Sequence, residues 1–186
     1  IARQKLWTAP IATTVEPVAG DGLVYVVEAE SMTALRSGNG DVAWRVPFNA
    51  MLAVPPALSG EWLITAAASG EITARRARDG VVVWQQPLGT APNVQPAIAG
   101  GRVFVTTADS FVHALNRDTG ALLWKRPLGG PGNDILATAD RVFLGSRDRY
   151  FYCLNAMTGG VEWRWATGAN VIGRPVIDEQ SVYFVS

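Results

Sequence analysis

Five of the seven tryptophans recur at nearly constant spacing, and this regularity constrains the fold more than any other feature of the sequence. The spacings are 37, 40, 40 and 39 residues, and the tryptophans are Trp7, Trp44, Trp84, Trp124 and Trp163. A period of roughly 20–50 residues is the signature of a repeat architecture, in which each unit buries its apolar face against the next. We therefore expect a series of similar units, each close to 40 residues long.

Three further columns share this period. A small residue lies ten positions before each of the last four tryptophans, at Ala34, Ala74, Ala114 and Cys153. A glycine lies four positions before each of the same four tryptophans, at Gly40, Gly80, Gly120 and Gly159. A proline precedes an apolar triplet by seven residues at Pro17, Pro56, Pro96 and Pro175, whereas the fourth unit has Ile135 in that place. Independent columns with one period exclude a chance arrangement of tryptophans.

The segments within a unit are short, rich in β-branched and aromatic residues, and bounded by Gly, Asp, Asn or Ser, which favours strands over helices. In the third unit we expect four strands, at Val94–Ala99, Arg102–Thr107, Phe111–Asn116 and Leu122–Arg126. The Asn116–Gly120 connection has the Asp, Thr and Gly chemistry of a tight hairpin turn. Four antiparallel strands per unit predict the blades of an all-β propeller.

The repeat also divides the chain. We expect complete blades at residues 11–47, 48–87, 88–127 and 128–166, the last strand of a preceding blade at 1–10, and the start of a further blade at 167–186. This organisation favours a piece of a larger ring. The alternative is a five-bladed ring, in which the N-terminal strand at Gln4–Ala9 and the two C-terminal strands share one blade.

The pattern Ala-x5-Gly-x3-Trp, seen at Ala114, Gly120 and Trp124, resembles the tryptophan-docking motif of the pyrroloquinoline-quinone-like propeller repeat family. The resemblance covers nearly the whole chain and implies that each tryptophan packs between adjacent blades. It also implies that the blades belong to a larger ring of seven or eight. The family usually has Asp two residues after the alanine, so part of its polar docking is expected to differ at Arg36, Arg76, Asn116 and Asn155. A WD40 propeller is excluded, since no docking tryptophan precedes an Asp and the one histidine cannot serve every blade.

The composition narrows the function classes. Sixteen basic and sixteen acidic residues cancel, which argues against nucleic acid as a partner and is more typical of a protein partner. No apolar run is long enough to span a membrane. The single cysteine, Cys153, excludes an internal disulfide or a clustered cysteine metal site, and its place in an alanine column predicts an inert, buried thiol.

Few side chains suggest chemistry. His113, the only histidine, precedes the docking alanine within an alternating strand and is interpreted as structural. Ser146–Tyr150 is interpreted as a solvated hairpin, because the corresponding turns of the other units differ in charge. Trp62 and Trp165 are expected on core or inter-blade faces. No catalytic, cofactor-binding or metal-binding residue is assigned.

Three functions remain open. The non-catalytic relatives that the resemblance suggests include the lipoprotein of the outer-membrane β-barrel assembly machinery. A protein-interaction scaffold of that kind, with protein partners in the cell envelope and a periplasmic, outer-membrane-associated location, is the first hypothesis. The second is a fragment of a quinoprotein dehydrogenase, an enzyme class that carries a pair of adjacent cysteines over the quinone. The third is a ligand-binding or sensor propeller of a signalling protein.

Overall fold

The computed structural model describes residues 7–178 and 181–186, and this part of the chain forms five antiparallel sheets without any helix. The first sheet contains β1 (Val18–Gly20), β2 (Leu23–Val27), β3 (Ser31–Arg36) and β4 (Val42–Pro47). The second contains β5 (Ala57–Ser59), β6 (Trp62–Ala66), β7 (Glu71–Arg76) and β8 (Val82–Pro87). The third contains β9 (Ala97–Ala99), β10 (Arg102–Thr107), β11 (Phe111–Asn116) and β12 (Leu122–Pro127).

The fourth sheet contains β13 (Gly132–Ala137), β14 (Arg141–Ser146), β15 (Tyr150–Asn155) and β16 (Val161–Ala166). The fifth has two strands among the described residues, β17 (Ile172–Ile177) and β18 (Val182–Val185). In every sheet the strands follow each other in sequence order. The predicted fold class, an all-β propeller with four-stranded antiparallel blades, is confirmed.

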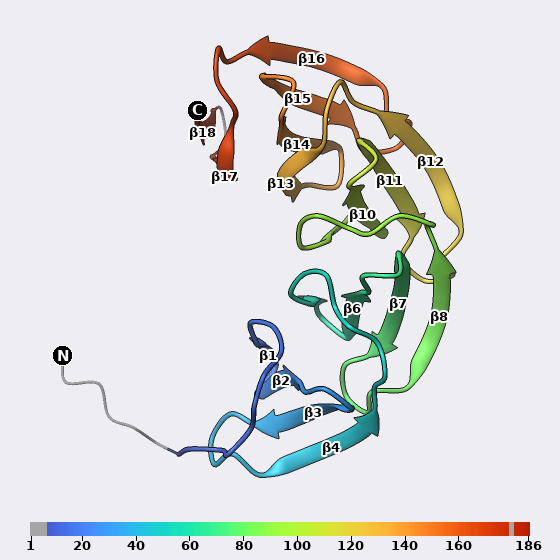
Figure 1. The fold of residues 1–186 in the computed structure, drawn as a ribbon, viewed down its shortest axis with the longest axis vertical. Coiled ribbons are helices and arrows are strands. Elements are labelled where there is room, and N and C mark those ends of the chain that lie inside the picture. The colour runs from blue at the N-terminus through green and yellow to red at the C-terminus, as the bar shows by residue number, and fades with distance from the viewer. Residues whose placement is uncertain (1–6, 179–180) are drawn as a thin grey trace, which may run out of the picture.

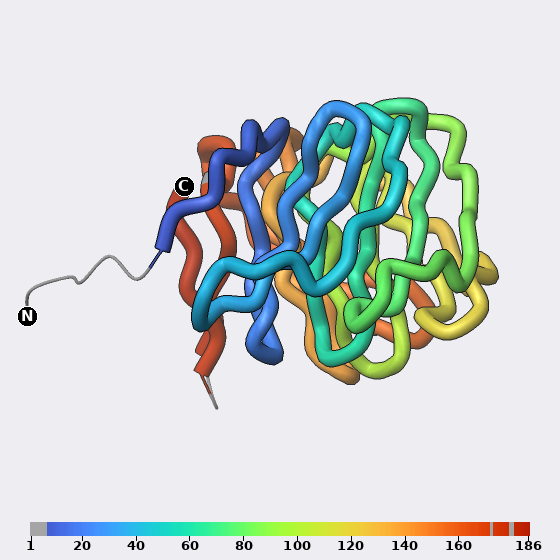
Figure 2. The backbone as a smooth tube through the Cα atoms, turned by 90° about the horizontal axis from the view of Figure 1, so that it is seen from below, coloured from blue at the N-terminus to red at the C-terminus, as the bar shows by residue number. Residues whose placement is uncertain are grey.

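The blades stand around an arc (Figure 1), with β1 and β13 toward its inside and β4, β8, β12 and β16 along its outer perimeter. The first strands of successive blades touch one another along the inside of the arc, from β1 to β5, β9, β13 and β17. Figure 2 shows that the strands run between two opposite rims, where all the connections lie. Each blade therefore presents one sheet face to each of its neighbours.

The alternative five-bladed ring is not formed by the described residues. Figure 1 shows an open arc, with the first blade at one end and β17–β18 at the other. Part of the predicted N-terminal strand, Gln4–Leu6, lies outside the described residues, and Trp7–Ala9 carries no strand assignment. The described residues of the N-terminal segment do not pair with β17 or β18.

The prolines explain where the first strands begin. In three blades Pro17, Pro56 and Pro96 directly precede β1, β5 and β9, because proline has no N–H group for the strand ladder. Pro175 of the same column instead lies within β17, where the strand register shifts between Ile172 and Val176. For this reason β9 starts at Ala97 and not at the predicted Val94. In the fourth blade, where Ile135 replaces the proline, β13 continues through that position.

The core lies between the sheets. Between the second and third blades, for example, Ile64 and Ile72 pack with Val103, Val105 and Leu115, all fully buried. Similar clusters join the first blade to the second and the third to the fourth. Because this packing is between neighbours only, the arc behaves as a one-dimensional stack of blades.

Candidate functional site

The predicted docking residues meet within each blade as cross-strand pairs. The small residue of the third strand lies directly opposite the tryptophan of the fourth strand, in the pairs Ala34–Trp44, Ala74–Trp84, Ala114–Trp124 and Cys153–Trp163. The four small residues are completely buried. In all four blades the strand register shifts immediately after this pair. Such a β-bulge re-aims the side chains next to it.

The indole rings reach across to the next blade. Each Nε1–H donates a hydrogen bond to a backbone carbonyl in the turn between the third and fourth strands of the following blade. The pairs are Trp7 with Ser37 at 2.7 Å, Trp44 with Ala77 at 2.8 Å, Trp84 with Arg117 at 2.6 Å, and Trp124 with Ala156 at 3.0 Å. The indole nitrogens at these half-buried positions thus have partners, as buried polar groups require.

The accepting turn is tied to the rest of its own blade. The same four residues donate their backbone N–H to a carbonyl in the turn between the first and second strands, in the pairs Ser37–Gly22, Ala77–Glu61, Arg117–Gly101 and Ala156–Asp140. One residue per blade therefore accepts a hydrogen bond from the tryptophan of the preceding blade. The same residue donates a hydrogen bond to the turn between the first and second strands of its own blade.

The glycine of this turn is needed for two reasons. Gly40, Gly80, Gly120 and Gly159 have positive φ angles of 79°, 72°, 76° and 68°. A Cβ atom on any of them would lie 2.6–2.8 Å from the ring of the preceding blade's tryptophan. Both the backbone conformation and the close approach favour glycine. The stabilising role of this column stays a prediction, because the geometry alone does not measure it.

Trp163 differs from the other members of the column. Its ring packs against Phe143 and Phe151 of its own blade, yet 41% of its surface is exposed. Among the described residues no turn of a following blade accepts its indole N–H, because the β17–β18 sheet has two strands and no third-to-fourth-strand turn. Trp165 also lies on this inter-blade side, but at 66% exposure it is not buried as a core position would be.

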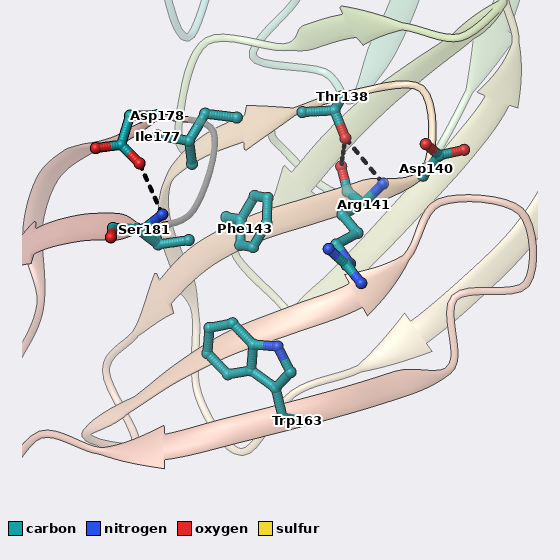
Figure 3. A pocket seen from close by; sticks show the side chains of 9 residues that line it. Thr138, Asp140, Arg141, Phe143, Trp163, Ile177, Asp178 and Ser181 are labelled. Carbon is teal, nitrogen blue, oxygen red and sulfur yellow. Dashed lines mark hydrogen bonds between the residues drawn. The ribbon is translucent and has the colours of Figure 1, made fainter.

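A cleft of about 290 Å³ occupies the place next to Trp163. Figure 3 shows the Trp163 ring and Phe143 on one side and Ile177 and Ser181 of the fifth blade on the other. Arg141 lies in its wall, and its guanidinium forms a 2.9 Å ion pair with Glu162. A second, more open groove continues from it over Trp163, Trp165, Val182 and Phe184.

In the turns between the third and fourth strands, other polar side chains accept the backbone hydrogen bonds where the family usually has an aspartate. Asn116 Oδ1 accepts the backbone N–H groups of Asp118 and Thr119, and Asn155 does the same for its turn. In the second blade Asp79 Oδ1 accepts the N–H of Val81, and Arg76 pairs with that carboxylate at 2.9 Å. Polar side chains of these turns therefore bond the backbone of their own turn where the family usually has its aspartate.

On the opposite rim, an acidic residue near the second-to-third-strand connection contacts the fourth strand of three blades. These contacts are Glu28–Arg45 at 2.7 Å, Glu71–Gln85 at 3.0 Å and Asp109–Lys125 at 3.8 Å. The pKa of Glu28 is lowered, mainly because the Ser31 hydroxyl donates to its carboxylate. Sequence reasoning missed this recurrence, since the acid is displaced by a few residues from one turn to the next.

In the hairpin Ser146–Tyr150, Arg147 and Arg149 are exposed, while Asp148 is engaged within the protein. The Asp148 carboxylate accepts hydrogen bonds from the hydroxyl of Tyr152 and from the backbone N–H groups of Tyr150 and Gly129. Burial and the bond to Asp148 raise the pKa of Tyr152. These contacts hold the hairpin against the connection from the third blade, which includes Gly129. The acidic group is engaged within the protein and is not presented as a ligand.

His113 and Cys153 are both buried. His113 lies opposite Lys125 at 2% exposure, and burial, reinforced by that lysine, lowers its pKa. Burial and the nearby Glu162 raise the pKa of the Cys153 thiol to about 11, which keeps it protonated and unreactive. Neither residue has the exposure that a nucleophile or general base requires. Trp62, the remaining tryptophan, lies half-buried in β6 beneath the Arg117 guanidinium.

A polar groove between the first two blades was not anticipated. It is lined by Asn49, Thr73 and Gln85, and by Arg75, whose guanidinium lies 5.5 Å from the Phe48 ring centroid. Arg75 replaces a leucine that is buried in the other three blades, at Leu35, Leu115 and Leu154. The signal in the sequence was this break in an apolar column.

The described residues contain no group of three or more His, Cys, Asp or Glu side chains that could hold a metal ion. In the same part of the chain, no helix has the length and apolarity needed to cross a membrane. The features found among the described residues are inter-blade contacts, polar rims and grooves.

Comparison with known proteins identifies the family. A family model described as outer membrane protein assembly factor BamB matches residues 28–139 and 108–186, well over half of the chain. The chain belongs to the BamB-like family of PQQ-like repeat proteins. The resemblance inferred from the Ala-x5-Gly-x3-Trp motif is confirmed. A search of curated proteins found no match.

Solved structures support the fold of this BamB-like chain. The crystal structure of BamB from Moraxella catarrhalis is 19% identical, with a TM-score of 0.82 over 94% of this chain and 55% of that protein. The computationally designed Ika8 protein is 14% identical, with a TM-score of 0.79 over 90% of this chain and 54% of that one. The chain thus spans about half the length of each of these structures.

Proposed function

We propose that this BamB-like chain acts as a non-catalytic scaffold. It would hold protein partners together during outer-membrane protein assembly, at the periplasmic side of that membrane. The observation that carries the proposal is the family match over residues 28–186, whose description names an outer membrane assembly factor. Membership of that family supports protein partners in an envelope complex. The balanced charge of the chain is compatible with such partners.

The contacts of the rims support a binding role. The acids near the second-to-third-strand connections are held by side chains of the same blade, as in Glu28 with Arg45. Side chains fixed in this way lose little further freedom on binding, which favours association. The groove beside Arg75 adds a place where polar groups of a partner could be received.

The residues present do not fit the quinone cofactor of the related dehydrogenases. Those enzymes carry adjacent cysteines over the quinone, whereas this chain has one cysteine, Cys153, which is buried opposite Trp163. The raised pKa of its thiol opposes redox chemistry there.

Complementation tests the proposal. The whole protein would be produced in a bacterium that lacks its own BamB-like protein, and the amounts of folded outer-membrane β-barrel proteins would be measured. Recovery of those proteins, together with the protein in the periplasmic or outer-membrane fraction, is expected. No recovery, combined with alcohol oxidation that appears only after pyrroloquinoline quinone and Ca²⁺ are added, would overturn the scaffold and favour the dehydrogenase.

A further inference from the structure

The junction between the first and second blades departs from the next two junctions at two facing positions. At those later junctions both positions hold leucines that share one core cluster, in the pairs Leu88–Leu115 and Leu128–Leu154. At the first junction the same positions hold Phe48 and Arg75, and the guanidinium lies 5.5 Å from the ring centroid. The repeat therefore has a charged group here, where it otherwise buries an apolar one.

The fourth strand of the second blade changes in the opposite sense. In the other three blades a cation occupies one position of this strand, at Arg45, Lys125 and Arg164. The second blade has Gln85 there, opposite Thr73, and its amide donates to Glu71 at 3.0 Å. The second blade thus lacks the cation of the outer strand and carries Arg75 on β7 instead, facing the first blade.

The positive charge of Arg75 is not paired with an acid among the described residues. Its Nη1 donates to the neutral carbonyl of Gly80 at 3.0 Å, and its Nε is buried without a hydrogen-bond partner in that part of the chain. Glu71 lies on the same face of β7, but its carboxylate accepts from Thr73 and Gln85 and forms no ion pair with Arg75. Burial lowers the pKa of Arg75. Since buried charges are generally paired, this guanidinium calls for an anionic partner.

The groove beside Arg75 has room for such a partner. Its volume is about 250 Å³, below the roughly 300–1,000 Å³ of sites that hold drug-sized molecules. Hydroxyl and amide groups line it next to the guanidinium, at Asn49, Thr65, Thr73 and Gln85. A groove of this size and polarity suits one side chain of a partner and its adjoining backbone better than a cofactor.

The charges in the groove favour a carboxylate over a phosphate. Arg75 is the one cation among the described residues that line the groove, and Glu71 lines it as well. One guanidinium balances the single charge of a carboxylate, to which it can donate charge-assisted hydrogen bonds. A phosphorylated side chain carries about −1.5 to −2 charges, so Glu71 would repel it more strongly.

We propose that the Arg75 groove binds the carboxylate of an aspartate or glutamate side chain of a partner protein. The guanidinium holds the carboxylate while it remains against the Phe48 ring, and the hydroxyl and amide groups of the groove bind the adjoining peptide groups. That the carboxylate belongs to a protein rests on the proposed function, whereas the preference for a carboxylate rests on the groove alone.

Two arginine variants separate the groove from a general effect of charge. Arg75→Leu gives the position the side chain of the other three blades, so we expect the variant to fold with an unchanged or higher thermal midpoint. Arg78→Leu is the matched control, because it removes the same charge from the same blade. The Arg78 side chain is 71% exposed and does not line the groove.

The probe is a pentapeptide with blocked ends and one glutamate between four alanines, and its control has glutamine in place of the glutamate. Binding to the whole protein would be followed by NMR through the arginine Nε–H signals, where the Arg75 signal is the one that Arg75→Leu lacks. We expect the glutamate peptide to shift this signal and to bind at least about tenfold more tightly than the glutamine peptide. Arg75→Leu should lose this preference, and Arg78→Leu should keep it.

Equal binding of the two peptides, or a preference that survives in Arg75→Leu, would overturn the proposal. A stronger response of the Arg75 signal to inorganic phosphate than to the glutamate peptide would also overturn it and assign the groove to phosphate groups. A lower thermal midpoint of Arg75→Leu with unchanged peptide binding would make Arg75 a structural residue.

Complementation with the whole protein keeps this inference apart from the proposed function. Recovery of outer-membrane proteins without any preference for the glutamate peptide would reject the groove and leave the scaffold. A preference for the glutamate peptide without recovery would reject the scaffold and, with it, the assembly partner as the source of the carboxylate.

Discussion

At the scale of single residues, His113 is a useful reporter of folding because it is the only histidine. Its pKa is lowered in the folded protein, first by burial and then by Lys125. The unfolded chain therefore takes up a proton near its ordinary value of 6.5, while the folded chain resists it. The folded protein therefore keeps its full stability above pH 6.5 and loses stability as the pH falls below that value.

We expect the free energy of unfolding to fall between pH 6.5 and 5, by at most about 1.4 kcal/mol per pH unit. His113→Gln should remove most of this slope, whatever its effect at neutral pH. Urea unfolding of the wild-type and His113→Gln proteins at several pH values measures this pH dependence of the free energy of unfolding. An unchanged slope in the variant would mean that His113 titrates normally in the folded protein.

Gly120 is constrained both by its positive φ and by its contact with a tryptophan ring, and comparison with Gly89 separates the two effects. Gly120 and Gly89 both have positive φ, at 76° and 80°, but only Gly120 lies against a tryptophan ring. Alanine at either site should cost about 1–2 kcal/mol for the left-handed backbone. Gly120→Ala should lose about 1–3 kcal/mol more, because its Cβ is too close to Trp84. Equal losses in denaturant unfolding would contradict the docking contact.

At the scale of elements, the interface between blades is where the tryptophan column acts. Trp124→Ala empties a position between the third and fourth blades, next to Phe104, and removes the bond to the Ala156 carbonyl. We expect a loss of about 3–5 kcal/mol in the free energy of unfolding. In a protein of these 186 residues, Trp163→Ala should lose no more than about half of that, because the ring is partly exposed and meets no such turn among the described residues. A Trp124→Ala loss under about 1 kcal/mol would show that the docking assignment is wrong.

The hairpin turn of the third blade depends on one side chain. Asn116→Ala removes an acceptor used by two backbone N–H groups, so we expect a loss of about 1–2 kcal/mol. Asn116→Asp keeps the acceptor and restores the residue usual in the family, and it should be nearly neutral. Thermal unfolding of the two variants side by side distinguishes them. Equal destabilisation would mean that the amide N–H₂ group of Asn116 matters more than its oxygen.

At the scale of the whole molecule, blades contact only their neighbours, so in a protein of these 186 residues stability should decline toward the ends of the arc. β10 and β11 lie in the middle and hold fully buried residues such as Phe104 and Leu115. β17 and β18 form the two-stranded sheet at the end. We expect the amides of Val103–Val105 to exchange hydrogen much more slowly than those of Val182–Val185. Uniform exchange, followed by mass spectrometry, would indicate that the arc unfolds as one unit.

The repeat, the strands and the turn glycines could be predicted from the sequence because they depend on local constraints. Short runs of β-branched and aromatic residues bounded by turn residues favour strands, and a glycine four positions before the tryptophan permits a positive φ. The prolines before β1, β5 and β9 limit the ladder because proline has no N–H group, although the exact start of β9 and the place of Pro175 within β17 required the structure. The resemblance to the family followed from the same columns.

Other features depend on how the sheets stand around the arc, and only the tertiary structure decided them. Trp84 meets Arg117 and Gly120 because the curvature brings one blade's outer strand to the next blade's turn, 33 residues away for the hydrogen bond. The exposure of Trp163 arises from what faces it across the blade junction, which its own sequence environment does not reveal. Spacing along the chain therefore determined the blade, while the placement of one blade against another determined its contacts.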